Sequence, residues 1–231
     1  VGPDPATQRL MCERGEADLC GFPPAQSKEL ADKYGINKSQ FFVKPQIGNW
    51  YLAMNTSRGI FQNNTKLRQA VSNAIDRRFM VAQHGYMAEA VSELQEITIN
   101  AGDTIHYAFA PMGMPGFKNY DIFSLKGPNY AKAKPLAQGN TRDGKAVMYT
   151  FNTSQGPPIA QSVQFNLKQI GIDVEIKLFD RVVQHEKTAT RGEPFDLTLE
   201  GWLADYPDPA NFINVLLDGR RIQADNNVNA S

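Results

Sequence analysis

The sequence predicts an α/β fold, in which helices flank a mixed sheet and long irregular loops connect part of the chain. Residues 145–200 alternate strand, helix, strand, helix and strand patterns. Residues 63–85 form the clearest amphipathic helix, and residues 49–55 have the period-two pattern of a strand. A strand–helix–strand connection brings the chain back in the same direction, so the 145–200 segment predicts parallel neighbours in the sheet.

Residues 1–46 contain only short pieces, including a small helix over "SKELADKYG" that Gly35 ends. Pro45 and Gly48 punctuate the chain before the pattern changes, which places a domain boundary near Ile47. The start does not resemble a signal peptide, and neither end carries a closing element. We therefore expect a piece of a longer chain, with domains at 1–46 and 47–231.

The next elements follow from hydrophobic spacing. In "NWYLAMN", Trp50, Leu52 and Met54 share one face of a strand. In the following helix Asn64 or Thr65 can cap the first turn and Gly85 ends the last. Its apolar positions recur at three and four residues: Leu67, Ala70, Val71, Ala74 and Ile75. Residues 86–139 are rich in Gly, Pro and Met, which favours long loops with short helices.

The regular part begins at Lys145. "AVMYTF" predicts a strand, and "PIAQSVQFNLKQIG" predicts a helix with inward Ile159, Val163, Leu167 and Ile170. "IDVEIKL" alternates Ile172, Val174, Ile176 and Leu178 with charged residues; "VVQHEKTATRG" is a second helix and "FDLTLE" a third strand. A last helix is expected after Asp208, with Asp208 as its cap, Pro209 as its first residue, and Phe212, Ile213, Leu216 and Leu217 facing inward.

Composition excludes several classes of function. The numbers of Lys plus Arg and of Asp plus Glu are equal, at 24 each. The sequence therefore lacks the excess of basic residues that would indicate a nucleic-acid partner. The sequence contains no nucleophile elbow and no Gly-rich phosphate loop after a strand, and its three His are scattered. His185 and Glu186 are adjacent on a helix and point to different faces. We expect neither enzymatic activity nor a cofactor or metal.

Cys12 and Cys20 are the only cysteines and lie eight residues apart. The residues leave two interpretations open: buried thiols, or a local disulfide formed in an oxidising compartment. Their spacing is not the CxxC of a metal or redox site.

The segment "GWLADYPDPANF" at 201–212 is the strongest candidate site. It leaves the carboxyl end of the third strand, and ligands of open α/β sheets bind beside the carboxyl ends of strands. Trp202 can be a core residue or a wall of the ligand pocket. Asp205 can stabilise a turn or pair with a positively charged ligand group.

Several segments in order resemble the family 5 extracellular solute-binding proteins, the peptide-binding components of ABC importers. They are "LRQAVSNAIDR", "PMGMPGF", "SLKGPNYAKAK", "QFNLKQIGIDVEIKLF", "GEPFDL" and "GWLADYPDPANF", and the match covers about Gly15 to Asn229. The resemblance implies a periplasmic-binding-protein-like (type II) fold, with two lobes that close over a ligand. Residues 47–231 then resemble the C-terminal lobe, and residues 1–46 the end of the N-terminal lobe and the hinge crossing; the rest of the N-terminal lobe and a returning segment are missing.

The resemblance also implies partners and a location. The protein is expected to be periplasmic or extracellular, anchored to the membrane or secreted, and to deliver its solute to a membrane permease. This location agrees with a disulfide between Cys12 and Cys20. In the family's peptide binders, the Asp three residues after the Trp pairs with the ligand's α-ammonium, which assigns that role to Asp205 and a cleft position to Trp202.

One departure bears on the ligand. In the family's dipeptide binders, a basic residue near the end of the strand equivalent to "VMYTFNTSQ" pairs with the ligand's carboxylate, whereas this chain has Gln155 and Gly156 there. Gln cannot form the bidentate charged pair that Arg forms. We therefore expect a longer peptide or another amine-bearing small solute. The expected ligand-binding residues are Asn152, Gln155, Gly201, Trp202, Leu203 and Asp205. The alternatives are a sensory or adaptor domain with the same fold, and a binder of a non-peptide solute.

Overall fold

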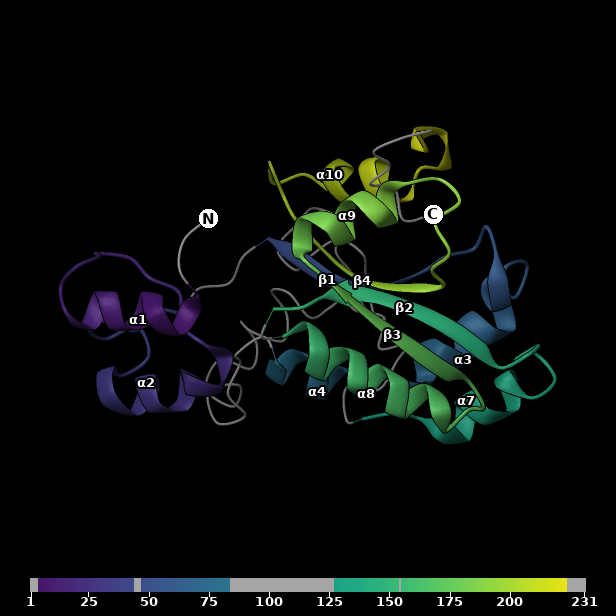
Figure 1. The fold of residues 1–231 in the computed structure, drawn as a ribbon, viewed down its shortest axis with the longest axis horizontal. Coiled ribbons are helices and arrows are strands. Elements are labelled where there is room, and N and C mark those ends of the chain that lie inside the picture. The colour runs from purple at the N-terminus through teal and green to yellow at the C-terminus, as the bar shows by residue number, and fades with distance from the viewer. Residues whose placement is uncertain (1–3, 44–46, 84–126, 154, 224–231) are drawn as a thin grey trace.

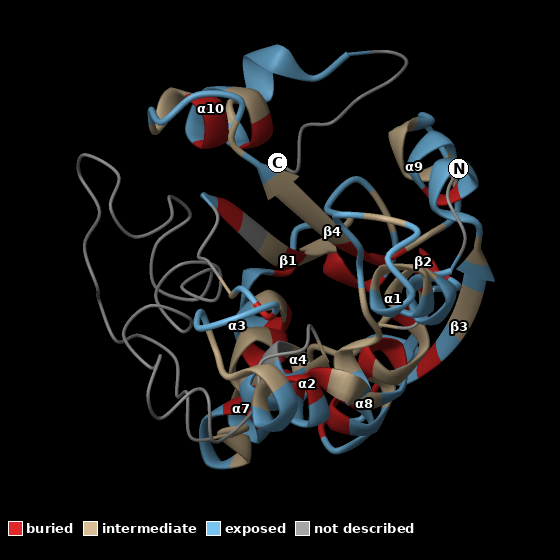
Figure 2. Cartoon of the chain, turned by 90° about the vertical axis from the view of Figure 1, so that its left-hand side faces the viewer, coloured by how far each residue is buried: buried red, intermediate tan, exposed pale blue. Residues whose placement is uncertain are grey.

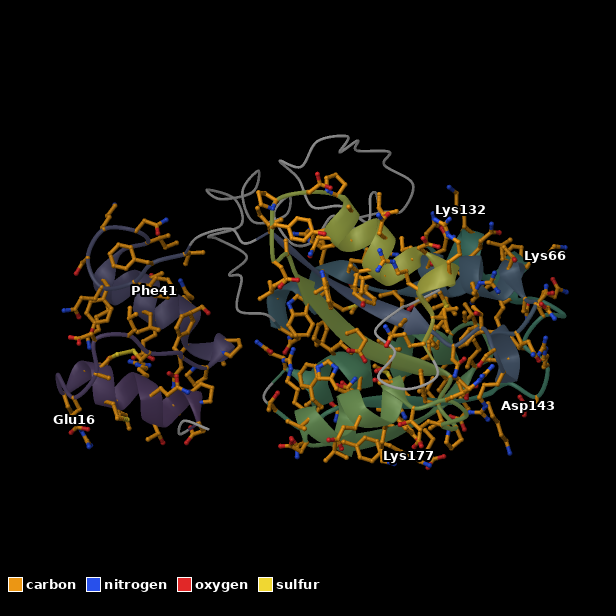
Figure 3. All side chains as sticks on the ribbon, turned by 90° about the horizontal axis from the view of Figure 1, so that it is seen from above. Glu16, Phe41, Lys66, Lys132, Asp143 and Lys177 are labelled. Carbon is orange, nitrogen blue, oxygen red and sulfur yellow. A yellow bond between two sulfur atoms is a disulfide. The ribbon has the colours of Figure 1, made fainter. Side chains whose placement is uncertain are left out.

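The computed structural model describes residues 4–43, 47–83, 127–153 and 155–223. The first of these ranges forms a small unit at one end of the molecule, in which helices α1 (Pro5–Glu13) and α2 (Ser27–Tyr34) lie side by side (Figure 1). A 3-10 turn, η1 (Pro24–Gln26), precedes α2, and Gly35 ends α2 with a φ of 72°. Cys12 and Cys20 are joined by a disulfide here, with their Cα atoms 6.1 Å apart (Figure 3).

Four strands form one sheet in the order β1–β4–β2–β3. Their bounds are β1 Gly48–Met54, β2 Lys145–Phe151, β3 Asp173–Phe179 and β4 Leu197–Leu203. Strand β2 pairs in parallel with β3 and with β4, whereas β1 pairs antiparallel with β4. The predicted mixed α/β sheet with parallel neighbours is therefore confirmed.

Helices cover both faces of this sheet (Figure 1). One face carries α3 (Thr65–Ala74), α4 (Arg77–Gln83), α7 (Tyr130–Ala137) and α8 (Gly156–Lys168). The other carries α9 (Arg181–Ala189) and α10 (Ala210–Phe212), which continues into a π-turn, η4 (Ile213–Leu217). The 3-10 turns η2 (Gly59–Phe61) and η5 (Gly219–Arg221) complete the described elements. No helix in the described ranges is both long and apolar enough to cross a bilayer.

The buried residues lie in the strands and in the helices packed on them (Figure 2), and their side chains form two clusters. Strand β1 shows why, because its side chains alternate between the faces. Trp50, Leu52 and Met54 pack against the larger core, to which α3 and α8 contribute, as their spacing predicted. Tyr51 packs on the opposite face with Phe212 and Leu216, which are fully buried.

The long helix predicted over 63–85 is wrong, because it is interrupted. Asn64 caps α3 as expected, but the chain leaves the helix at Ile75, whose ψ is 132°. Two side chains compensate for the break: Asn166 accepts the Asp76 amide at 3.0 Å, and Asp76 accepts the Phe79 amide at 3.1 Å. A side chain that bonds the backbone offers it an alternative to the helical ladder. The predicted stop at Gly85 lies outside the described residues.

The prediction for the last helix is wrong in two respects. Pro209 occupies the cap position rather than the first turn, and only three α-helical residues follow before the π-turn. Phe212 and Leu216 are buried as predicted, but Ile213 and Leu217 are 48% and 39% exposed. The wider π-turn leaves only one pair of residues facing the sheet. Leu178, also expected inward, is 46% exposed near the end of β3.

Candidate ligand-binding site

The carboxyl ends of β2, β3 and β4 lie at one edge of the sheet, because these strands run in the same direction. Three connections leave this edge: residues 152–155 lead into α8, Asp180 leads into α9, and residues 204–209 lead into α10. Strand β1 begins at the same edge, where Gly48 pairs with Leu203. The structure therefore brings both predicted segments, 152–155 and 201–205, to a common edge.

Strand β4 extends further than predicted and includes Gly201, Trp202 and Leu203. Trp202 is half-buried against Tyr51 and Phe212, and its indole Nε1 donates to Asn211 Oδ1 at 2.8 Å. Trp202 is thus a partial core residue that keeps some exposed area at the edge. Leu203 is 59% exposed and adds an apolar side chain there.

Asn211, in α10, was not identified from the sequence. Its Oδ1 also accepts the main-chain N–H of Asp205 at 3.3 Å, and its Nδ2 donates to Asp205 Oδ2 at 3.3 Å. The amide is 1% exposed, so it joins the indole, the backbone and the carboxylate from a buried position. A buried amide whose oxygen and nitrogen both form hydrogen bonds holds the side chains around it in place.

The Asp205 side chain is itself exposed, and no described residue forms an ion pair with it. Its hydrogen bond from Asn211 leaves the other carboxylate oxygen, Oδ1, available. Asp208 has a different role, because its carboxylate accepts the main-chain N–H of Ala210 at 2.8 Å from the position before the Pro209 cap. The two aspartates of this segment are therefore not equivalent.

Gly201 has a steric reason to be glycine. A Cβ atom at this position would lie 3.0 Å from two ring atoms of Trp50, its partner on β1. The Trp50 indole thus lies close to the β4 backbone, and its ring centroid is 6.0 Å from that of Phe151 on β2. Trp50, predicted only as a core residue, is part of the edge that carries the candidate site.

Arg181 completes this arrangement and was not selected from the sequence. It is the first residue of α9, and its guanidinium carbon lies 5.2 Å from the Trp50 ring centroid and 5.2 Å from the Phe151 ring centroid. A cation at this distance from an aromatic face is attracted by the ring's quadrupole. The sequence did contain a signal for Arg181, because a basic residue stands there between a predicted strand and a predicted helix.

Where the family's dipeptide binders carry a basic residue, the Thr153 carbonyl accepts the main-chain N–H of Gly156 at 3.0 Å as the chain enters α8. The main-chain N–H of Asn152 donates to the Phe179 carbonyl at 2.8 Å, while the Asn152 side chain is exposed. Gln155 occupies the cap position of α8 without a capping hydrogen bond from its side chain. Gly156 follows, with no room for a side chain beside the Phe151 carbonyl. Asn152 and Gln155 thus lie at the edge with polar groups available.

A hollow of about 760 Å³ lies at the opposite edge of the sheet. Its walls include Lys145 and Asp173, the first residues of β2 and β3. Arg142 spans part of it by donating to the carbonyls of Gly59 and Gln62. Because this guanidinium is already bound by the protein's own backbone, we place the candidate site at the carboxyl edge.

A sheet whose carboxyl edge combines aromatic rings, an exposed carboxylate and an arginine is typical of a ligand-binding α/β lobe. The chain belongs to the bacterial extracellular solute-binding proteins, family 5, since the family model for the middle region matches residues 1–224.

Known proteins of this kind are similar along most of the chain. The oligopeptide-binding protein OppA of Bacillus subtilis is 25% identical over 220 residues, covering 92% of this chain and 38% of OppA. The periplasmic murein peptide-binding protein MppA of Escherichia coli is 26% identical over 215 residues, covering 91% of this chain and 37% of MppA. The chain thus spans less than half the length of these relatives.

Solved structures share the fold. The periplasmic binding protein DppA of Helicobacter pylori, in complex with the peptide STSA, superposes with a TM-score of 0.69 at 25% identity, covering 94% of this chain and 38% of DppA. The structure of E. coli MppA gives a TM-score of 0.70 at 22% identity, covering 97% of this chain and 42% of MppA, and supports the fold alone. The periplasmic-binding-protein-like fold expected from the sequence is confirmed.

Proposed function

We propose that this chain supplies most of one lobe of the solute-binding subunit of an ABC importer. Residues 47–231 form the C-terminal lobe, and residues 1–46 are the end of the N-terminal lobe and the crossing into the hinge. The family match and the coverage of about two-fifths of each relative support a partial chain of such a subunit. The partners are the remaining N-terminal lobe and a membrane permease, and the location is periplasmic or extracellular.

The ligand is a peptide-like or amine-bearing solute that binds at the carboxyl edge of the sheet. The observation that carries this proposal is Asp205, an exposed carboxylate that Asn211 holds in place and that has no cationic partner among the described residues. Closure of a second lobe over this edge removes water from the carboxylate, which then requires a positive charge to balance it. A free amine of the ligand supplies that charge.

In this role the subunit binds its solute without a chemical reaction. The subunit holds the solute between its lobes and presents the closed form to the permease, because contacts on both lobes favour closure. Trp202 and Leu203 provide an apolar wall at the edge, while Asn152 and Gln155 provide polar groups. The names of OppA and MppA state that these relatives bind peptides, which supports a peptide-like ligand here.

The test uses the full-length protein and a synthetic library of random tri- to hexapeptides, prepared with free and with acetylated amino termini. Captured peptides are identified by mass spectrometry, and the affinity of the most enriched ones is measured by calorimetry. We compare the wild type with Asp205→Asn, which keeps the shape of the side chain and removes its charge. Asp208→Asn is the matched control, because an Asn at this position still accepts the Ala210 amide.

The expected result is selective. Removing one partner of a buried charge pair costs about 3–5 kcal/mol, which is several hundredfold or more in affinity. The wild type and Asp208→Asn should discriminate against acetylated peptides, whereas Asp205→Asn should bind free peptides weakly and discriminate little. Equal discrimination by all three proteins would show that Asp205 only shapes the turn. A wild type that captures no peptide would refute the peptide-like ligand.

A further inference from the structure

The strongest feature not used by the proposed amine contact is Arg181 on its two aromatic rings. The rings belong to different strands, Trp50 to β1 and Phe151 to β2, and Arg181 reaches them from the end of β3. Each ring centroid is 5.2 Å from the guanidinium carbon. The guanidinium therefore connects three of the four strands at the carboxyl edge.

The rings under Arg181 are held firmly. Phe151 is 1% exposed, and the Trp50 ring lies so close to Gly201 that an added Cβ there would be 3.0–3.1 Å from three ring atoms. An aromatic surface fixed by the core restricts the rotamers of the arginine above it. A guanidinium stacked in this way is pre-organised, so less conformational entropy is lost when it binds a partner.

The charge of Arg181 is not neutralised by the described part of the chain. No ion pair joins Arg181 to a described carboxylate, and its side chain is exposed. The adjacent Asp180 caps α9 by accepting the Val182 amide at 3.0 Å. Aromatic stacking uses the face of the guanidinium and leaves the N–H groups at its rim, where a planar carboxylate binds in a bidentate manner.

We propose that Arg181 receives a carboxylate of the ligand, at the same edge at which Asp205 receives its amine. This proposal rests on the proposed function and extends it to a ligand with both charges. It also revises the expectation drawn from Gln155. A positive charge for the ligand's carboxylate is present at this edge, but it follows β3 instead of β2. In a peptide the carboxylate is either the C-terminus or an Asp or Glu side chain.

The experiment uses the full-length protein and the random peptide library, prepared as free acids and as C-terminal amides. Three variants are compared with the wild type: Arg181→Gln, Arg181→Lys and Arg191→Gln. Arg191 is the matched control, because it is an exposed arginine beyond the far end of α9. Melting curves check that each variant folds, and Arg181→Lys keeps the charge while losing the planar fork.

The wild type should prefer free acids over amides, and Arg181→Gln should lose about 10- to 100-fold in affinity for free acids, as expected for a charged hydrogen-bonded pair. Arg181→Lys should retain part of the preference, and Arg191→Gln all of it. If the wild type instead enriches Asp- or Glu-containing peptides from the amide library, and Arg181→Gln abolishes the enrichment, the carboxylate is that of a side chain. Both patterns support the proposal.

Two results would overturn it. An unchanged acid preference and unchanged Asp or Glu enrichment in Arg181→Gln would show that the arginine does not contact the ligand. An equal loss of affinity for free acids and for amides would show that Arg181 acts in lobe closure or in the packing of Trp50. A wild type that captures neither library would refute the peptide-like ligand itself, an outcome distinct from binding that ignores carboxylates.

Discussion

Replacing Gly156 by alanine tests the close approach between α8 and β2 on which the edge depends. Gly156 is buried at the start of α8, and a Cβ atom there would overlap the Phe151 carbonyl oxygen and lie 2.9 Å from the carbonyl carbon. The obstructing atoms are backbone, and β2 is held between β3 and β4. Neither α8 nor β2 can therefore move aside without losing hydrogen bonds or packing.

Two effects of opposite sign decide how much Gly156→Ala changes the free energy of unfolding. Alanine in place of glycine within a helix gains up to about 1 kcal/mol of helix propensity. Overpacking a well-filled site costs about 1–3 kcal/mol, and sometimes more. Because the contact is with backbone rather than with a flexible side chain, we expect the upper end of that cost and a net loss of about 2 kcal/mol.

The assay is urea denaturation of the full-length protein, with the unfolding midpoint compared between wild type, Gly156→Ala and Gln161→Ala. Gln161 is exposed on the same helix, so its alanine variant reports propensity without overpacking. We expect a lower midpoint for Gly156→Ala and little change for Gln161→Ala. A Gly156→Ala protein as stable as the wild type, or more stable, would refute the close packing of α8 on the end of β2.

Two further predictions concern Glu200 and the disulfide. Glu200 accepts hydrogen bonds from Gln184 and Thr198 at 2.8 and 3.1 Å, yet its burial raises its pKa above the ordinary value of 4.5. The stability contributed by its protonated form should be present below that value and be lost as pH rises through the raised pKa, so Glu200→Gln should flatten the fall in stability that begins as pH rises above about 4.5 in unfolding titrations. For Cys12 and Cys20, a thiol assay on denatured protein from an oxidising compartment should find no free sulfhydryl, and Cys20→Ser should destabilise the small unit by about 2–3 kcal/mol.

The sequence predicted the elements whose periodicity is strong and local. All four strands and the buried face of α8 follow from apolar spacing, because these elements bury apolar side chains in the core. The predicted helix over 63–85 was wrong because its break depends on Asn166, which is 90 residues from the amide it binds. The π-turn after Phe212 depends in the same way on tertiary contacts.

The candidate site was predicted only in part. Asp205 and Trp202 belong to one continuous segment whose composition is unusual for a simple turn. Arg181 and Trp50 reach the same edge from distant parts of the sequence, and only the strand order reveals that they meet. The role of Asn211 depends on the direction of one side chain, which periodicity does not predict.

The position of β4 has a consequence for how such proteins diversify. Strand β4 pairs with β1 over seven residues and also borders β2, so its register cannot slip without exchanging the two faces of the sheet. The two connections that surround the edge, residues 152–155 and 204–209, have no such constraint and can change in length and charge. Natural variation in ligand preference among relatives should therefore concentrate in these connections and at the residue that follows β3, while the strand between them keeps its glycine and its aromatic residue.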